Sequence, residues 1–175
     1  MAKPNILTHF EAALLPHLPA AYNLARWLTR NDHDAEDLVQ EAYLRGFKSF
    51  EGFHGGDGRG WILAIVRNTC YSWLQQRRNQ ELAEVFNEEV HTAEDHSGSP
   101  EAVMLQSADA QLLRDALEKL PVEFREILVL RELEGMSYRE IADLAGIPVG
   151  TVMSRLARGR ERLQRELTQA VKREP

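Results

Sequence analysis

The stretch that decides the fold occupies residues 137–165 and reads SYREIADLAGIPVGTVMSRLARGRERLQR. Ser137 and Glu140 have the spacing of a capping box, which predicts the start of a helix just ahead of an apolar run. Gly146 suits the left-handed conformation that ends a helix, and Pro148 cannot continue that helix. A second and longer helical pattern follows. A short helix, a glycine-containing turn and a long helix are the layout of a helix-turn-helix.

The second helix of this layout separates an apolar face from a basic face. At about 100° per residue, its apolar positions fall on one side, at Val152, Leu156, Gly159 and Leu163. Its arginines fall together on another side, at Arg155, Arg158, Arg162 and Arg165. Guanidinium groups can reach phosphates and guanine edges in a major groove, and Ser154 lies near enough to donate to a phosphate or a base. A solvated basic face on a surface helix is the alternative, but the capping box, the glycine turn and the two faces together favour DNA binding.

Helical periodicity dominates the rest of the chain, and no stretch alternates as a strand, so the expected fold class is all-α. The expected helices cover residues 8–29, 34–50, 61–77, 99–119 and 121–131. Pro16 and Pro19 should bend the first of them. Asp34 and Ser99 are the expected N-caps of the second and the fourth. The glycine-rich residues 51–60 should form a loop.

Charge is unevenly distributed along the chain. The formal net charge is −6, from 21 Lys and Arg against 27 Asp and Glu. Residues 79–109 contain no Lys or Arg and eight Asp or Glu, so this segment alone carries −8. Residues 79–98 also lack periodicity, which predicts a flexible acidic linker, although an irregular packed surface segment is the alternative. We therefore expect two small helical domains, residues 1–78 and 101–175, joined by residues 79–100.

Two surfaces of the first domain are rich in polar side chains. The expected second helix has an acidic stripe that consists of Asp37, Gln40, Glu41 and Leu44, and periodicity alone favours a simple solvated face. The expected third helix combines rings with arginines and amides, at Trp61, Arg67, Asn68, Tyr71, Arg77 and Arg78. Rings beside arginines suit single-stranded DNA, because unstacked bases lie on aromatic side chains. Trp73 is expected in the core, and for Trp61 the core and the surface are equally good interpretations.

Other classes of protein lack support in the sequence. No run approaches the roughly 20 apolar residues of a membrane span, and no secretion signal is visible, so the cytoplasm is the expected location. Cys70 is the only cysteine, so an intrachain disulfide is impossible. The six histidines form no metal-binding motif, and the glycine-rich loop lacks the lysine of a phosphate-binding loop. We therefore expect no catalytic residues, no metal and no cofactor, and predict that the chain is not an enzyme.

Eight short motifs follow one another along nearly the whole chain. They are DLVQEA at residues 37–42, GWI at 60–62, IVRNT at 65–69, LP at 120–121, LVLRELE at 128–134, GMSY at 135–138, EIA at 140–142 and PVGTV at 148–152. In this order they resemble the sigma-70 family of bacterial transcription-initiation factors, in its extracytoplasmic-function (ECF) class. The resemblance implies a protein that binds core RNA polymerase, directs it to specific promoters and helps to open the −10 region.

The resemblance also implies roles for individual residues. The polymerase β′ clamp would be bound by Asp37, Gln40 and Glu41. The single-stranded −10 element would be bound by Trp61, Arg67, Asn68, Tyr71, Arg77 and Arg78, with Asn68 at the pocket for a flipped base. The −35 element would be bound by Ser137, Thr151, Ser154, Arg155, Arg158 and Arg162. Met153 and Ala157 depart from the larger polar or aromatic side chains that the family often has there, so the resemblance does not imply the −35 sequence.

The partners that the resemblance implies are core RNA polymerase (through its β′ clamp and β flap), promoter DNA and an anti-sigma factor, without membrane insertion. Two alternatives remain: a sigma-like mimic that sequesters an anti-sigma factor, and a helix-turn-helix repressor with a helical sensor domain. The arginine-rich helix counts against the mimic, and the aromatic helix and acidic linker count against the repressor. In transcription with purified core polymerase, a repressor would block synthesis and a mimic would do nothing.

Overall fold

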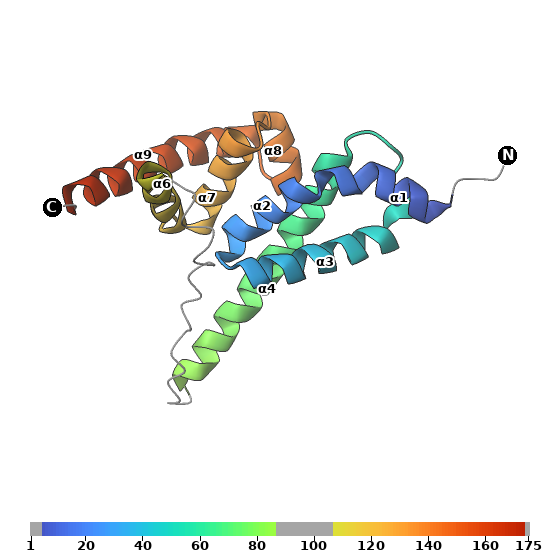
Figure 1. The fold of residues 1–175 in the computed structure, drawn as a ribbon, viewed down its shortest axis with the longest axis horizontal. Helices are drawn as coiled ribbons and strands as arrows, with labels where there is room; N and C mark the ends of the chain where they lie inside the picture. Colours follow the sequence, from blue (N-terminus) through green and yellow to red (C-terminus); the bar gives the residue numbers. More distant parts are fainter. Residues whose placement is uncertain (1–4, 87–106, 174–175) are drawn as a thin grey trace. The chain divides into compact units, whose positions relative to one another are not determined.

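The computed structural model describes residues 5–86 and 107–173, and Figure 1 shows their arrangement into helices. All regular elements in these two ranges are helical, without a strand, as expected of an all-α chain. The chain divides into two compact units, Met1–Ser97 and Gly98–Pro175. Each unit has its own buried apolar core.

The first unit begins with two helices where the sequence predicts one bent helix. These are α1 (Ile6–Leu14) and α2 (Leu18–Thr29), with a 3-10 turn between them over Leu15–His17. Pro16 and Pro19 lie at the start of the turn and of α2, where a missing N–H breaks no helical hydrogen bond. The bend predicted at the prolines is therefore confirmed, and it is sharp enough to interrupt the helix.

The next helix, α3 (Asp32–Lys48), begins after Asn31. Arg30 ends α2 in the left-handed conformation, with φ of 60°, and Asn31 then accepts the backbone N–H of Asp34 at 2.9 Å. The prediction that Asp34 is the N-cap was wrong, because Asn31 already supplies the capping oxygen three residues earlier. Asp34 lies in the first turn instead, where the helix dipole favours a carboxylate.

The core of the first unit forms where α2, α3 and α4 (Gly58–Phe86) pack against one another. Its largest fully buried side chains include Leu24, Leu28, Ile62, Leu63 and Val66. Beside this core lies an aromatic cluster that consists of Phe10, Phe47, Phe50, Phe53 and Trp61. Cys70 and Thr69 are also buried, as expected for the inner side of the third predicted helix.

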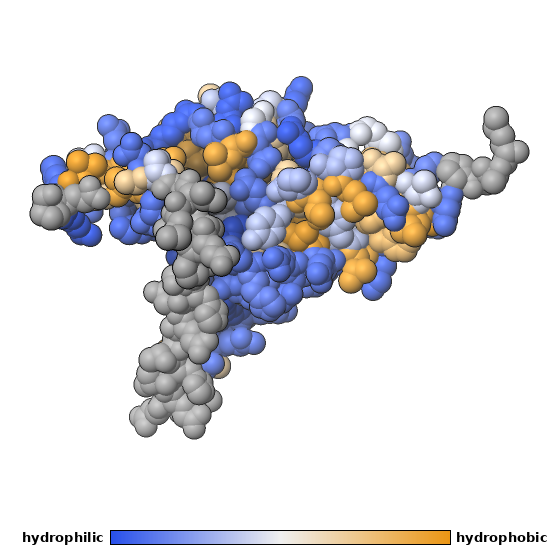
Figure 2. Space-filling view, in the orientation of Figure 1, coloured by the Kyte–Doolittle hydropathy of each residue, from blue (hydrophilic) through white to orange (hydrophobic). Residues whose placement is uncertain are grey.

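Apolar side chains are also exposed on the first unit. They include Ile6, Leu7, Leu15, Leu18, Leu44 and Phe47, on α1, the 3-10 turn, α2 and α3. Figure 2 shows apolar surface gathered where these elements lie. The Tyr43 hydroxyl ties α3 to the end of α1 by donating to the carbonyl of Leu14 at 2.8 Å, and burial raises the pKa of Tyr43 to about 12.

Helix α4 is longer at both ends than the predicted range 61–77. It begins at Gly58, where a Cβ would lie only 2.8 Å from the carbonyl oxygen of Ala13, so α1 and α4 approach closely there. It continues to Phe86, so the prediction of an aperiodic linker was wrong for residues 79–86. Good helix formers fill this extension, and Arg77 reaches Glu81 one turn on, with 3.9 Å between Nε and Oε1. An exposed helix needs no apolar stripe, and residues 87–100 lie outside the described ranges.

The second unit begins with α6 (Ala108–Glu118) and α7 (Val122–Leu128), followed by a π-helical turn, η3 (Val129–Leu133). Ser107 caps α6, whereas the cap predicted at Ser99 lies outside the described residues. Arg125 is buried, and its Nη1 donates to the carbonyls of Glu118 at 3.2 Å and Leu120 at 2.8 Å. These charge-assisted bonds hold the turn between α6 and α7.

The predicted helix-turn-helix is confirmed as α8 (Tyr138–Ala145) and α9 (Val149–Arg173). Both bonds of the capping box form: Ser137 Oγ accepts the N–H of Glu140 at 3.1 Å, and the Glu140 carboxylate accepts the N–H of Ser137 at 3.3 Å. Gly146 adopts the left-handed conformation, with φ of 68°, and ends α8. The predicted apolar face is buried at Val152, Leu156 and Gly159 and half-buried at Leu163.

Replacing Ser137 by alanine should lower the free energy of unfolding of the second unit by about 1 kcal/mol, because the N–H of Glu140 loses its acceptor. Urea denaturation followed by far-ultraviolet circular dichroism measures the change. Thr168→Ala is the control, since that exposed hydroxyl only donates to the Gln164 carbonyl within α9. Equal stability losses in the two variants would contradict a capping role.

Candidate nucleic-acid interface

The first half of α9 exposes the basic surface that the sequence predicts. Arg158 is exposed and Arg155 is half-buried, and neither makes an ion pair or a hydrogen bond within residues 5–86 and 107–173. Ser154 is exposed, and its hydroxyl donates to the carbonyl of Thr151 at 3.1 Å. Two guanidinium groups with all their donors available, on a solvent-facing helix, can bind phosphates or guanine edges.

Farther along α9, the arginines have partners in the protein. The Arg162 guanidinium lies 5.1 Å from the centre of the Phe124 ring, and Arg165 pairs with Glu161 at 3.3 Å. Arg160, which the sequence reasoning did not single out, donates to Glu132 at 2.7 Å, and this hydrogen bond raises its pKa. Glu132 lies on the π-helical turn, so the pair ties α9 to the segment before α8. No local sequence signal marks such a pair.

A second candidate surface lies on α4. Arg67 lies over the ring of Tyr71, with 4.3 Å between the guanidinium carbon and the ring centroid, and Asn68 is exposed beside them. The three side chains are neighbours because they are three or four residues apart on one helix. Trp61, by contrast, is half-buried, with its ring centroid 5.3 Å from that of Phe53. Of the six predicted −10 residues, the structure therefore brings these three together and packs Trp61 into the aromatic cluster.

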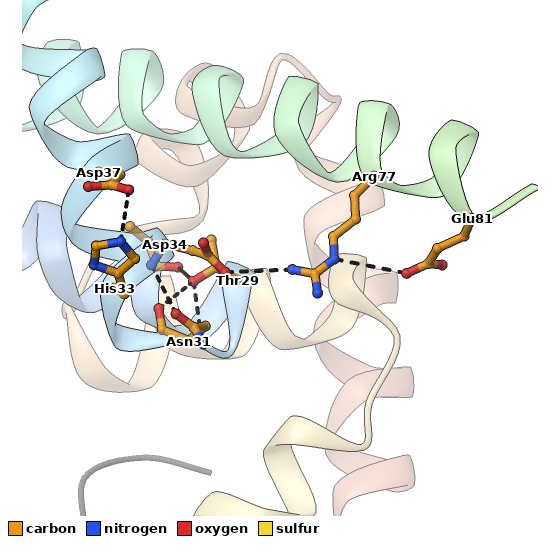
Figure 3. Close-up of polar contacts among 8 residues, drawn as sticks. Thr29, Asn31, His33, Asp34, Asp37, Arg77 and Glu81 are labelled. Carbon is orange, nitrogen blue, oxygen red and sulfur yellow. Dashed lines mark hydrogen bonds and ion pairs between the residues drawn. The ribbon is translucent and has the colours of Figure 1, made fainter. Parts of the chain in front are cut away.

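The two arginines near the middle of α4 differ in their surroundings. Arg77 stacks on Trp73 at 5.0 Å, and its Nη1 lies 3.6 Å from a carboxylate oxygen of Asp34 on α3. Figure 3 shows this ion pair beside the cap of α3, with Glu81 on the other side of the guanidinium. Arg78 is exposed and has no ion pair or hydrogen bond to any described residue. Arg78 is thus the more available of the two for a phosphate.

The acidic stripe on α3 faces solvent. The side chains of Asp37 and Glu41 are 62% and 48% exposed, and Gln40 is also exposed. Each carboxylate has a cationic or titratable neighbour one turn away: His33 lies 3.5 Å from Asp37 (Figure 3), and Arg45 lies 2.5 Å from Glu41. Leu44, which follows on the same stripe, is 64% exposed. A row of accessible carboxylates that ends in an accessible apolar side chain suits a protein partner with a basic surface.

Comparison with known proteins identifies the family to which the chain with these surfaces belongs. Residues 14–80 match the family model for sigma-70 region 2, and residues 110–163 match the model for sigma-70 region 4. The ECF RNA polymerase sigma-E factor of Haemophilus influenzae is 35% identical over 151 residues, which cover 82% of this chain and 79% of that protein. The chain belongs to the ECF class of the sigma-70 family. It is thus a sigma factor, in a family that acts in transcription.

Further relatives match this ECF sigma factor over different shares of their own length. The ECF RNA polymerase sigma factor SigE of Mycolicibacterium smegmatis is 37% identical over 148 residues, and the match spans 85% of this chain but only 57% of that relative. Among solved structures, the sigma factor RpoE of Bartonella quintana, in complex with the anti-sigma factor NepR, has a TM-score of 0.73 at 30% identity. That alignment covers 91% of this chain and 97% of the other.

The two matched regions contain the candidate surfaces of this sigma factor. The acidic stripe and the α4 residues up to Arg78 lie in the region 2 match, and the α9 residues up to Arg162 lie in the region 4 match. In the described part of this ECF sigma factor, each helix is too short or too polar to cross a membrane.

Proposed function

We propose that this ECF sigma factor binds core RNA polymerase, brings it to specific promoters and helps to separate the strands at the −10 element. The single observation that carries the proposal is the presence of unpaired arginines on α9, within the region 4 match of a sigma-70 chain. We assign polymerase and −10 binding to residues 1–78, −35 binding to residues 101–175, and a connecting role to the acidic residues 79–100. If this chain were a mimic that only sequesters an anti-sigma factor, it would not need DNA-binding arginines on α9.

The −35 element would be bound by the helix-turn-helix. Arg155 and Arg158 would reach base edges or phosphates in the major groove, because their donors are not occupied within the protein. Ser154 and Thr151 would add hydrogen bonds near the start of α9. Ser137, at the start of α8, would approach the DNA backbone. Arg162, whose guanidinium lies over the Phe124 ring, would contact a phosphate.

The −10 element would be bound by α4 as a single strand. Tyr71 and Arg67 offer a ring and a guanidinium on which a base can stack, and Asn68 offers an amide for the edge of a flipped base. Arg78 would contact the backbone directly, and Arg77 would do so by exchanging Asp34 for a phosphate. Trp61 would contribute the exposed part of a ring that the aromatic cluster holds in place.

The polymerase clamp would meet Asp37, Gln40 and Glu41 on α3, and the second unit would meet the β flap. An anti-sigma factor is a further expected partner, since the related Bartonella factor is in complex with one. The chemistry of transcription would remain in the polymerase, so we expect no enzymatic activity, cofactor or metal in this chain. Because core polymerase is cytoplasmic in bacteria, the cytoplasm is the expected site of action.

Run-off transcription with purified core polymerase tests the proposal. The chain should start transcription at specific positions on genomic fragments, and Arg158→Ala should lower the yield about 10-fold at limiting polymerase, because one guanine or phosphate contact is worth about 1–3 kcal/mol. Lys172→Ala, which removes an exposed cation near the far end of α9, is the matched control and should leave the yield unchanged.

The same assay separates the alternatives. A repressor would lower the basal transcription of the polymerase, and a mimic would leave it unchanged. Specific initiation that is insensitive to Arg158→Ala would contradict the role of α9 while leaving the assignment as a sigma factor intact.

A further inference from the structure

The start of α9 exposes apolar side chains that the proposed function does not use. Met153 is 53% exposed and Val149 is 40% exposed, and Ala157 is exposed as well. Because these residues are four apart, they form one row along the helix, which we call the apolar row. Among the described residues of α9, Val171 is the one other large apolar side chain with comparable exposure, and it lies at the far end of the helix.

The apolar row lies toward one edge of the solvent-facing side of α9, and the unpaired arginines lie toward the other edge. The buried side of the helix consists of Val152, Leu156 and Gly159. At about 100° per residue, Met153 projects roughly 90° from the middle of that buried side, and Arg155 projects roughly 70° from it in the opposite sense. Ser154 and Arg158 lie between them. Met153 and Arg155 thus project about 160° apart, at opposite edges of the solvent-facing side of α9. A helix that inserts the middle of this side, at Ser154, into the major groove presents Arg158 on one side of the contact and Met153 on the other.

The position of the row along α9 also favours contact with bases. In a helix-turn-helix, the N-terminal residues of the second helix contact the base edges. Val149 is the first residue of α9, and Met153 follows one turn later. Scattered exposed apolar residues need no explanation, but a row at the base-reading end of a helix, on the same solvent-facing side as two unpaired arginines, has a specific geometric relation to the groove.

The major groove offers one apolar group to such a row. Thymine carries a C5-methyl group there, whereas the other base edges present hydrogen-bond donors and acceptors. A methionine side chain has no hydrogen-bond donor to satisfy those edges, but its flexible thioether adapts to an apolar contact. Enclosing one methyl group is worth about 0.8 kcal/mol, which corresponds to roughly a fourfold change in binding.

We propose that Met153, supported by Val149, contacts a thymine methyl group in the −35 element and makes this sigma factor prefer a T·A pair at that position. The small side chain of Ala157 lets the base approach α9 one turn farther on. The inference rests on the proposed function, because it requires that α9 lies in the major groove at −35. It adds a specificity determinant at a position where arginine contacts alone would favour guanine.

The test begins with holoenzyme, assembled from core polymerase and the full chain, and a duplex library with a randomised −35 segment. Each thymine of the enriched −35 sequence is then replaced by deoxyuridine, which removes only the C5-methyl group. We expect replacement at one or two adjacent positions to weaken holoenzyme binding about fourfold. Met153→Ala should bind more weakly and lose the sensitivity to deoxyuridine at that position.

Two variants act as controls. Met153→Leu keeps an apolar side chain and should keep the sensitivity, and Val171→Ala removes an exposed apolar side chain from the far end of α9 and should change nothing. An enriched sequence whose binding is indifferent to every deoxyuridine replacement, or equal sensitivity in Met153→Ala, would overturn the inference alone. Enrichment of no −35 sequence by holoenzyme would overturn the proposed function together with it.

Discussion

Gly159→Leu should lower the free energy of unfolding of the second unit by about 2 kcal/mol. A Cβ at this position would already lie 3.3 Å from Cδ1 of Leu128 and 3.4 Å from Cβ of Phe124, because α9 rests directly on α7 there. The remaining carbons of leucine have no space between these buried side chains, and overpacking of this kind costs about 1–3 kcal/mol and occasionally more. The higher helix propensity of leucine, worth about 0.8 kcal/mol, offsets only part of that cost.

Gly150→Leu is the matched control, since nothing lies within 4 Å of a Cβ at that position of the same helix. Urea denaturation followed by circular dichroism measures the helix lost. The three tryptophans, Trp27, Trp61 and Trp73, all lie in the first unit, so their fluorescence gives an internal reference for that unit. A Gly159→Leu variant as stable as Gly150→Leu would contradict the close packing of α9 against α7.

The helix-turn-helix could be predicted because the signals that specify it are local. Ser137 and Glu140 satisfy each other within one turn, and Gly146 meets a conformational requirement of its own residue. No distant residue has to be known for either inference. The N-cap prediction at Asp34 was wrong because Asn31 and Asp34 both have side chains that can cap a helix. The left-handed conformation of Arg30 ends the preceding helix, so α3 begins after Asn31, the earlier of the two.

The extent of α4 could not be predicted from periodicity. An apolar stripe indicates where a helix packs, and residues 79–86 are helical while their described side chains are exposed. At its start α4 lies against another helix, since a Cβ on Gly58 would lie 2.8 Å from the carbonyl oxygen of Ala13. Apolar periodicity indicates the buried face of a helix, so it does not predict the part of a helix that extends beyond the core.

The sequence was enough to predict which residues make up the candidate surfaces, but not which of their arginines form ion pairs within the protein. Arg77 and Arg78 are adjacent in sequence, yet Asp34 on α3 neutralises only the first. In the sequence nothing distinguishes Arg160 from the neighbouring arginines, but in the structure it forms an ion pair with Glu132. Which arginine of a basic helix remains available for DNA is thus set by its partners in the folded protein, on the same helix or on others. The structure reduces the predicted basic face of α9 to Arg155 and Arg158 as its unpaired members.

Replacing both Asp37 and Glu41 by alanine should weaken binding to core polymerase about 100-fold and leave the fold intact. The two carboxylates are exposed, and each has only an i,i+4 neighbour on its own helix, a kind of pair that is worth about 0.3–0.5 kcal/mol to stability. At an interface, the same carboxylates would each satisfy a buried cation of the clamp. The loss of two such contacts is expected to cost about 3 kcal/mol, because the partner cations would remain buried without counter-charges.

The measurement is a titration of labelled core polymerase with each variant. Glu36→Ala with Glu51→Ala removes the same charge from exposed positions outside the stripe, and this control should bind like the unmodified chain. Arg155→Ala with Arg158→Ala should also keep full affinity for polymerase while promoter use falls. A loss of affinity shared by the control would mean that net charge, rather than the stripe on α3, determines binding. Retained affinity in the stripe variant would place the polymerase contact on another surface, for which the exposed Phe47 on the same helix is the nearest candidate.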